Sequence, residues 1–472
     1  MIDAPMAEDV ARRAGAQGWA PFIPPYTPPW PALPSLVRAM LRGDGDLLSL
    51  LPREAYHMKI GPLGYSRRSI VVVNDPPLVR HVLSDPEGIF PKSDLMVHAL
   101  EPLIGDSIFV SSGATWKRQR EMIDPALSLM RVNRAFPAMQ AGVADAEAEY
   151  DVHAKDGTRF SLDLAMSHLT ADIICRTVFT TTLATRTAHD VFDAFTEFER
   201  RVAQVEIRRL IWDKAWTRAP QKTPVLEACA VIRARIGEML DTHLAAGASF
   251  DDIAQQVIEA RDDLGGKAFT WEELIDQLGV LFLAGHETSA SALTWVFAIL
   301  ATQPALVARL RAEVEEVTNG GPIEYDHIKR LTLTRNIFRE TLRLYPPITF
   351  LPRVAMQDTA LNGYRLKKGA LVMVAPWVLH RHRLYWKDPN RFDPDRFLPE
   401  REGKITSGAY IPFGIGPRIC AGAAFATIEA TLLIARLFRR YDWTLDAPDS
   451  IRPAARLTTR PVDQVMCRVA RA

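Results

Sequence analysis

The decapeptide FGIGPRICAG at residues 413–422 brings together the residue types of a metal-binding turn. It holds three glycines, a proline, an arginine and Cys420, and the whole chain has only four cysteines. A helix that begins just after Cys420 would present unpaired N–H groups and a positive dipole end to a thiolate. Glycines permit positive φ and let backbone pass close to a flat partner. The turn therefore predicts either a metal ligand or a structural cysteine beside a tight turn.

The surroundings of Cys420 decide which metal would fit. One thiolate with a single cation two residues earlier, Arg418, suits an iron porphyrin whose propionates need a positive partner. Zinc is disfavoured because a structural zinc site takes four protein ligands. The remaining cysteines, Cys175, Cys229 and Cys467, stand singly without a CxxC pair, so neither a zinc ribbon nor a disulfide framework is indicated.

A second candidate site is the pentapeptide AGHET at residues 284–288, midway along a helix expected over 271–302. Small residues at 284 and 285 would let this helix lie close to a flat group. Thr288 can bond back to the carbonyl of Ala284 or leave it free, which opens the helix locally. Glu287 is an acid that can relay protons. Taken alone, the pentapeptide is typical of an ordinary helix that contains a glycine.

Two further pairs have helical spacing. Glu340 and Arg343 are three residues apart in a helix expected over 332–344, so they share a face and can pair. Most such pairs are solvated surface contacts worth about 0.2–0.5 kcal/mol. Trp116 and Arg120 are four apart, and their helix is either an exposed basic helix or one that contacts an anion.

The elements that must position these residues are mostly helices. Helical periodicity is expected over 36–51, 114–130, 161–180, 188–212, 223–246, 271–302, 304–317, 332–344 and 422–440. Strands are expected over 69–73, 349–355, 361–366 and 370–374, with a terminal pair within 442–470. The proline-rich residues 1–34 are expected to form an extended lead-in, and residues 35–472 a single domain. The fold class is mainly α with a small β part.

Composition excludes several classes of function. The chain has 472 residues, 48% hydrophobic content and a net charge of +1, which is enough for a large core and gives no basic surface for nucleic acid. Apolar runs fall short of the roughly 18 residues of a spanning helix, and the first residues do not form a signal peptide. We expect a cytoplasmic protein without a membrane anchor.

The full spacing F-G-x-G-x-R-x-C-x-G over residues 413–422 resembles the haem-ligand signature of the cytochrome P-450 family. Other family motifs follow in the right order, so the resemblance covers roughly residues 35–472. It implies the family fold, in which a long central helix lies over the haem and the cysteine turn lies beneath it. It also implies haem b as cofactor with Cys420 as the iron ligand, and it favours the soluble bacterial type.

The resemblance gives roles to the other motifs. Glu340 and Arg343 match the family's ExxR pair, and residues 392–397 resemble its PERF segment, so Arg396 would complete a structural network under the turn. The propionate-binding positions would be Trp116, Arg120, Arg353 and Arg418. Further cofactor contacts would come from Phe413, Gly414, Gly422 and Ala284.

Thr288 and Glu287 match the family's oxygen-activating pair. The implied reaction is insertion of one oxygen atom from O2 into a substrate, by hydroxylation or epoxidation. A peroxide-driven peroxygenase of the same fold and a non-catalytic haem-binding sensor are the alternatives. The nearly complete oxygen-binding pattern argues against both.

By analogy with the family, the substrate pocket is expected to be apolar and to take a hydrophobic small molecule, although half of its residues are expected to be core. The pocket residues would be Leu281, Phe109, Ile348, Phe350, Leu351 and Leu457. Electrons are expected from NAD(P)H through a separate ferredoxin and ferredoxin reductase, and the protein is expected to be a monomer. A basic docking face, or merely a solvated run of charge, would come from Lys117, Arg118, Arg436, Arg439 and Arg440.

Overall fold

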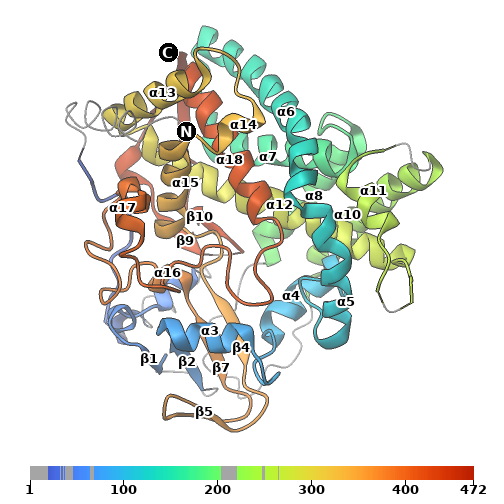
Figure 1. Cartoon of the computed structure of the whole chain (residues 1–472), viewed down its shortest axis with the longest axis vertical. Coiled ribbons are helices and arrows are strands. Elements are labelled where there is room, and N and C mark those ends of the chain that lie inside the picture. Colours follow the sequence, from blue (N-terminus) through green and yellow to red (C-terminus); the bar gives the residue numbers. More distant parts are fainter. Residues whose placement is uncertain are drawn as a thin grey trace.

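The structure, a computed structural model, describes residues 20–31, 33–35, 37, 46–63, 69–202, 221–246, 250–263, 265–455 and 457–472. Helices form most of it, and a small four-stranded sheet lies on the side away from α6 (Leu129–Asp156) and α10 (Thr223–Ala246) (Figure 1). The mainly-α fold with a small β part is confirmed.

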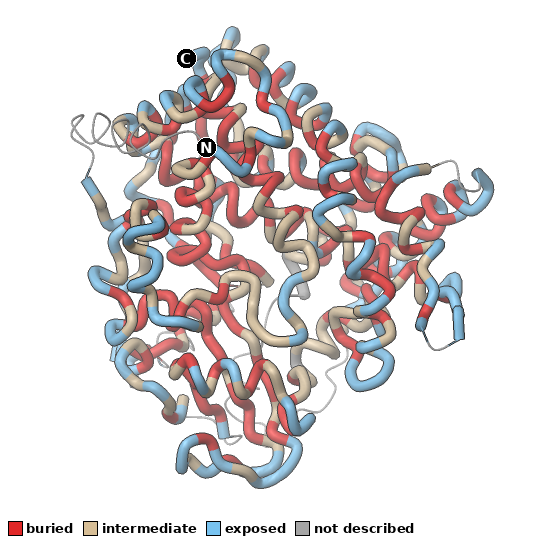
Figure 2. Tube along the Cα trace, viewed as in Figure 1, coloured by how far each residue is buried: buried red, intermediate tan, exposed pale blue. Residues whose placement is uncertain are grey.

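The central element is α12 (Trp271–Leu300). It begins with a capping box, in which Thr270 and Glu273 bond each other's backbone N–H groups at 3.3 and 2.8 Å. Beyond its first turns the helix is apolar on nearly all sides, so it must run through the core. Helices α7 (Leu162–Phe179), α10, α15 (Thr332–Leu344) and α18 (Ala423–Arg440) pack around it, and Figure 2 shows buried backbone concentrated there.

Shorter helices and turns complete the helical part. The α-helices not yet described are α3 (Pro76–Ser84), α4 (Asp94–Ile104), α5 (Gly113–Ile123), α8 (Arg186–Val202), α11 (Ile253–Glu259), α13 (Pro304–Thr318), α14 (Tyr325–Ile328), α16 (Pro376–Leu379) and α17 (Pro399–Glu402). The 3₁₀ turns are η1 (Leu47–Leu50), η2 (Arg53–Tyr56), η3 (Asp124–Leu127), η4 (Pro394–Phe397) and η5 (Pro448–Ser450).

The strands form four small sheets. The largest has the order β1 (Ile60–Pro62), β2 (Ile70–Val73), β7 (Leu371–Val374), β4 (Leu351–Val354), with β2 and β7 parallel. A second has the order β3 (Phe160–Ser161), β11 (Met466–Arg471), β8 (Tyr441–Leu445). Two antiparallel pairs remain, β5 (Thr359–Leu361) with β6 (Tyr364–Leu366) and β9 (Pro453–Ala455) with β10 (Thr459–Pro461).

Most expected elements are present, two expectations need correction, and one long helix was not expected. The strand expected over 361–366 is a hairpin, because Asn362 and Gly363 both have positive φ (46° and 80°) and turn the chain between β5 and β6. The helix expected over 114–130 ends at Ile123, where Pro125 starts a 3₁₀ turn. Helix α6 was not predicted, since Pro137 interrupts its pattern.

Two expected helices fall partly outside the described residues, namely 36–51 and the end of 188–212. Residues 20–31 of the lead-in contain no helix, whereas residues 33 and 34, expected to be extended, are helical. The lead-in lies against the domain: Phe22 bridges Phe392, and the Tyr345 hydroxyl donates to the carbonyl of Pro25. Among the described helices, none alone has the length and apolarity to cross a membrane. The pair α12 and α13 passes that test by length and composition only, with a bend of 112° between them.

Candidate active site

Cys420 lies in the turn that leads into α18. Gly414 and Gly416 have φ of 77° and 83°, a region that favours glycine, and the Cys420 N–H donates to the carbonyl of Phe413 at 2.9 Å. A Cβ added at Gly414 would meet no heavy atom within 4 Å, and one at Gly422 would meet only the Cys420 Sγ at 4.0 Å. The turn therefore presents bare backbone around an accessible sulfur.

The Cys420 thiol does not ionise readily by itself. Crowding by surrounding protein raises its pKa, against smaller lowering effects of the Gly422 N–H and Arg120. The N-terminus of α18 was expected to stabilise the thiolate and so lower this pKa. Desolvation has the opposite effect and is larger. Coordination to a metal removes the proton of a thiol outright, so a bound metal would reverse this balance.

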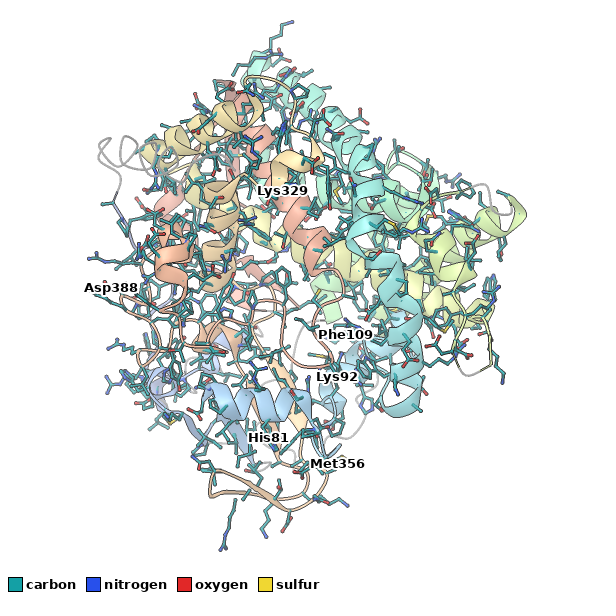
Figure 3. All side chains as sticks on the ribbon, viewed as in Figure 1. His81, Lys92, Phe109, Lys329, Met356 and Asp388 are labelled. Carbon is teal, nitrogen blue, oxygen red and sulfur yellow. The ribbon has the colours of Figure 1, made fainter. Side chains whose placement is uncertain are left out.

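Three cations converge near this turn, of which one, Arg353, is buried and two, Arg418 and Lys92, are half-buried. Arg418 donates from Nη2 to the carbonyl of Ser111 at 2.8 Å and has a buried Nη1 with no hydrogen-bond partner. Arg353, on β4, is 6% exposed. Lys92 donates to the carbonyl of Phe109 and lies 4.0 Å from the centroid of its ring, and both side chains are labelled in Figure 3.

These cations have too few anions among the described residues. Burial and repulsion from Arg418 lower the pKa of Arg353 to about 10, and burial and repulsion from Arg120 lower that of Arg418 to about 10. Burial and repulsion from both arginines of the group lower the pKa of Lys92 well below its usual value. Asp85 is the acid that acts against this for both arginines. A ligand with carboxylates would supply the missing negative charge. The cation group and the cysteine turn therefore fit a haem with its propionates.

Trp116 and Arg120 both lie on α5 and make different contacts with the cysteine turn. The guanidinium of Arg418 lies 4.4 Å above the Trp116 ring. Arg120 donates to the carbonyl of Ile419 at 2.7 Å and pairs with Asp124 at 2.7 Å. The structure thus brings Trp116 to the cation group, whereas Arg120 supports the backbone next to the cysteine.

Helix α12 has one accessible stripe at its middle. Between residues 278 and 300, Ala284 is exposed, Leu281, Gly285 and Thr288 are half-buried, and every other residue is buried. The Thr288 Oγ1 donates to the Ala284 carbonyl at 2.7 Å, which is one of the two arrangements expected. An added Cβ at Gly285 would lie 2.4 Å from Ile174 Cδ1, so this glycine allows close packing against α7.

Glu287 is buried and only 3% exposed. Its carboxylate accepts from Arg460 Nε at 3.0 Å and Nη2, and from the Thr458 hydroxyl. Arg460 outweighs burial and holds the pKa of Glu287 below its usual value. The acid is therefore ion-paired, which the sequence did not predict.

The network of Glu340, Arg343 and Arg396 is formed as expected. Both side chains of the first pair are 0% exposed, with nitrogen–oxygen distances of 2.7 and 2.8 Å, and Arg396 reaches Glu340 at 3.2 Å. Arg343 also donates to the carbonyls of His380, Pro389 and Arg391 at 2.9, 2.6 and 2.8 Å. The network ties α15 to the segment between β7 and the cysteine turn.

Comparison with known proteins agrees with this geometry. A sequence model described as cytochrome P450 matches residues 24–467, nearly the whole chain. The chain belongs to the cytochrome P450 family. Members of this family are monooxygenases that use haem and O2, and they typically take a small-molecule substrate and electrons from redox partners.

Named relatives come from several organisms. This P450 is 31% identical to cyclooctatin synthase of Streptomyces melanosporofaciens over 435 residues, which cover 89% of this chain and 88% of the relative. It is 28% identical to pentalenene oxygenase of Streptomyces avermitilis, with 89% and 88% covered. The crystal structure of the cytochrome P450DA heme domain superposes with a TM-score of 0.78 at 22% identity, covers 95% of this chain and 97% of that one, and shows the shared fold.

The residues expected in the substrate pocket of this P450 divide into two groups. Phe350 is 8% exposed and belongs to the core. The half-buried ones are Leu281, Phe109, Ile348, Leu351 and Leu457. Lys92 is the residue that sequence reasoning missed; a lone lysine gives no signal until its burial is known.

The expected basic docking face is not a free surface of arginines. The four arginines pair with carboxylates of the same chain: Arg118 with Asp262 and Glu273, Arg436 with Glu147, Arg439 with Glu315, and Arg440 with Asp151. Lys117 also lies 3.9 Å from a carboxylate, that of Glu121 on the same helix, and 75% of its side-chain surface is exposed. These pairs join α18 to α6 and α13, so the arginines of α18 stabilise the fold.

Proposed function

We propose that this P450 hydroxylates or epoxidises a terpenoid-like hydrophobic molecule, with Cys420 as the iron ligand of its haem b. The observation that supports this proposal most directly is the exposed Cys420 of the turn beside three cations that have too few anions among the described residues. When bound, haem supplies the activation of O2 and the transfer of one oxygen atom. All other contributions must come from the chain.

Several side chains would hold the cofactor. Arg418, Arg353 and Lys92 would bind the propionates by charge-assisted hydrogen bonds, with Trp116 supporting Arg418 through its ring. Phe413, Gly414 and Gly422 would border the porphyrin where backbone is bare. The buried network of Glu340, Arg343 and Arg396 would keep the turn in place, since such networks fix geometry more than they add stability.

Two residues of α12 would manage protons. The Thr288 hydroxyl lies on the accessible stripe with Ala284 and can turn from the Ala284 carbonyl to donate a hydrogen bond into the space next to the stripe. Glu287 would return protons to this region. Its pairing with Arg460 keeps it ionised between transfers.

The substrate proposal rests on the apolar pocket and on the relatives. The half-buried pocket residues are all hydrocarbon or aromatic side chains. The names of two relatives refer to pentalenene and to cyclooctat-9-en-7-ol. Both compound names denote unsaturated carbon compounds. A cyclic terpenoid with few polar groups fits both observations.

The source of electrons is also part of the proposal. Electrons would pass from NAD(P)H through a separate ferredoxin reductase and ferredoxin to a monomeric, cytoplasmic enzyme. Lys117 is the exposed cation on α5 that an acidic partner would meet.

The test is reconstitution with a ferredoxin, its reductase and NADPH under ¹⁸O2, using a panel of cyclic terpenes and terpene alcohols. We expect products that carry one ¹⁸O atom. Turnover with hydrogen peroxide alone, and none with the electron donors, would instead identify a peroxygenase. Binding of the compounds without any oxidation would identify a sensor.

A further inference from the structure

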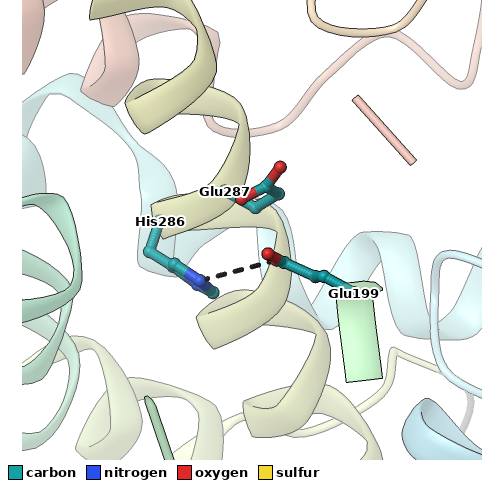
Figure 4. Close-up of side chains that lie close together, drawn as sticks. All are labelled: Glu199, His286 and Glu287. Atoms are coloured by element: carbon teal, nitrogen blue, oxygen red, sulfur yellow. Dashed lines mark ion pairs between the residues drawn. The ribbon is translucent and has the colours of Figure 1, made fainter. Parts of the chain in front are cut away.

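A cluster of ionisable side chains, two of them buried and one half-buried, joins α8 to α12. Glu199 of α8 and His286 and Glu287 of α12 each place a side-chain nitrogen or oxygen within 4.8 Å of the others (Figure 4). Glu199 Oε1 lies 3.7 Å from His286 Nε2 and has no hydrogen-bond partner. Arg460 completes the cluster by pairing with Glu287 and reaching the Ser167 hydroxyl of α7 at 3.1 Å.

The charges of this cluster require one extra proton. If both carboxyls were ionised and the imidazole neutral, Arg460 would leave one negative charge uncompensated among buried groups, which is costly. His286 Nδ1 lies 2.9 Å from the Phe282 carbonyl, so Nδ1 carries a hydrogen and Nε2 offers its lone pair to Glu199. The extra proton therefore resides between the Glu199 carboxyl and His286 Nε2.

Two further observations place that proton on Glu199. Burial and the Glu287 carboxylate raise the pKa of Glu199 well above its usual value, against the smaller effect of Arg460. Burial lowers the pKa of His286, which packs against Phe195 and Phe282 at centroid distances of 5.3 and 4.9 Å. A neutral acid next to an ion-paired carboxylate is a store of one transferable proton.

The cluster also has a way to refill. Of the three side chains, Glu199 is 21% exposed, whereas His286 and Glu287 are 2% and 4% exposed. Glu287 directly precedes Thr288, the hydroxyl of the accessible stripe. The order from solvent to the stripe is thus Glu199, Glu287, Thr288.

We propose that Glu199 is a second acid of the proton path, which gives its proton to Glu287 and regains one from solvent. This inference rests on the proposed function. In the proposed step, the ionised Glu287 carboxylate takes the proton of Glu199, then gives a proton toward Thr288 and becomes a carboxylate again. Glu199 stays a carboxylate until water protonates it. Only O–H bonds form and break, and no oxidation state changes.

A metal ion is the other reading of two carboxylates and an imidazole. Arg460 makes a metal site unfavourable, because its guanidinium already donates to both carboxylate oxygens of Glu287 and would repel a divalent cation. Calorimetric titration of the wild type with Zn²⁺ or Mg²⁺ should therefore detect no metal binding that is lost in Glu199→Gln. Such binding would overturn the proton-path proposal.

The first experiment reads the proton itself. Infrared spectra of the haem-loaded protein at neutral pH should show the C=O stretch of a protonated carboxyl that exchanges with D2O and disappears in Glu199→Gln. Glu429 is a second buried acid, so Glu429→Gln is measured in parallel and should remove a different band. An unchanged carboxyl band in Glu199→Gln would refute the proposal whatever the activity.

The second experiment reads proton delivery. Glu199→Gln should lower the fraction of consumed NADPH that appears as product by at least about tenfold, raise the solvent isotope effect and shift the pH profile. Spectral substrate affinity and the reduced carbon monoxide spectrum should stay unchanged, and Glu199→Asp should restore part of the coupling. The control is Asp193→Asn on the same helix, whose side chain is 67% exposed. Equal coupling and pH profile in Glu199→Gln and wild type would contradict the proposal.

The experiments distinguish a failure of the proposed function from a failure of the role proposed for Glu199. If the wild type lacks thiolate-bound haem or forms no oxygenated product, the proposed function itself fails. If the wild type oxidises substrate and Glu199→Gln does so equally well, only the role of Glu199 fails.

Discussion

At the scale of single residues, a functional site could be predicted where its residues lie in one short segment of the chain. Cys420, its glycines and Arg418 lie within ten residues, so their spacing alone predicted the turn. Lys92 and the partner of Glu287 were not predictable. Their importance comes from burial and from contacts between distant parts of the chain, for which a single sequence gives no pattern.

Replacing Lys92 with methionine should have opposite effects on the haem-free and haem-loaded protein. Without haem, the change removes a desolvated charge that Arg418 and Arg353 repel, so the free energy of unfolding should rise by about 1 kcal/mol. With haem, a propionate partner is lost, and the haem should dissociate several-fold faster. Denaturation of the apoprotein and haem transfer to apomyoglobin measure the two effects. The exposed Lys368→Met is the control and should change neither; a destabilised Lys92→Met apoprotein would contradict the argument.

Glu429 on α18 should make stability depend on pH. Its carboxyl is fully buried, accepts from Ser289 Oγ at 2.6 Å and has a pKa raised by burial to about 8. The unfolded chain loses this proton near the ordinary value of 4.5. Between these values the folded state binds more protons, so stability falls as pH rises, by up to about 1.4 kcal/mol per pH unit.

The variant Glu429→Gln keeps a neutral hydrogen-bonding group and should flatten this dependence. Urea unfolding from pH 5 to pH 9 would measure it, with the exposed Glu316→Gln as the matched control. A slope in Glu429→Gln equal to that of the wild type would show that Glu429 is already ionised in the folded protein.

At the scale of elements, strong periodicity and clear stop signals gave the helices that frame the site. Helices α10 and α15 have the predicted ends, and the proline pair at 346–347 explains the end of α15. Prediction failed where local chemistry was misjudged: Asn362 and Gly363 make a hairpin, and Pro137 is tolerated inside α6. The pocket was assignable only by analogy, because core and pocket residues have the same apolar character.

The packing of α12 against α7 gives a test at this scale. Gly285→Ala would put a Cβ 2.4 Å from Ile174 Cδ1, and we expect a loss of about 1–3 kcal/mol in stability from overpacking. Gly279→Ala on the same helix would meet no atom nearer than 3.6 Å and should stabilise by up to about 1 kcal/mol through helix propensity.

A double variant identifies the cause. Ile174→Ala makes room for the new methyl group, so its cost should be smaller in the Gly285→Ala background than in the wild type. Thermal unfolding of the four proteins of this cycle measures the coupling. Additive effects would mean that Gly285 is required for a reason other than its contact with Ile174.

At the scale of the whole molecule, the buried helix α12 and the cysteine turn before α18 meet at a single site. The turn leads into α18, which is tied to α6 and α13 through Arg436 and Arg439. The Glu340 network holds the segment between β7 and the turn. The cation group comes from β4, from the segment before α4 and from the turn itself. The family follows from the sequence model that matches residues 24–467.

The central claim is that Cys420 binds the haem iron through its thiolate. The most direct measurement is the absorption spectrum of the purified protein, reduced with dithionite and exposed to carbon monoxide, for wild type and Cys420→Ala. We predict a long-wavelength Soret band in the wild type and its loss in the variant. A correctly folded wild type that binds no haem, or a variant that keeps the same band, would contradict the claim.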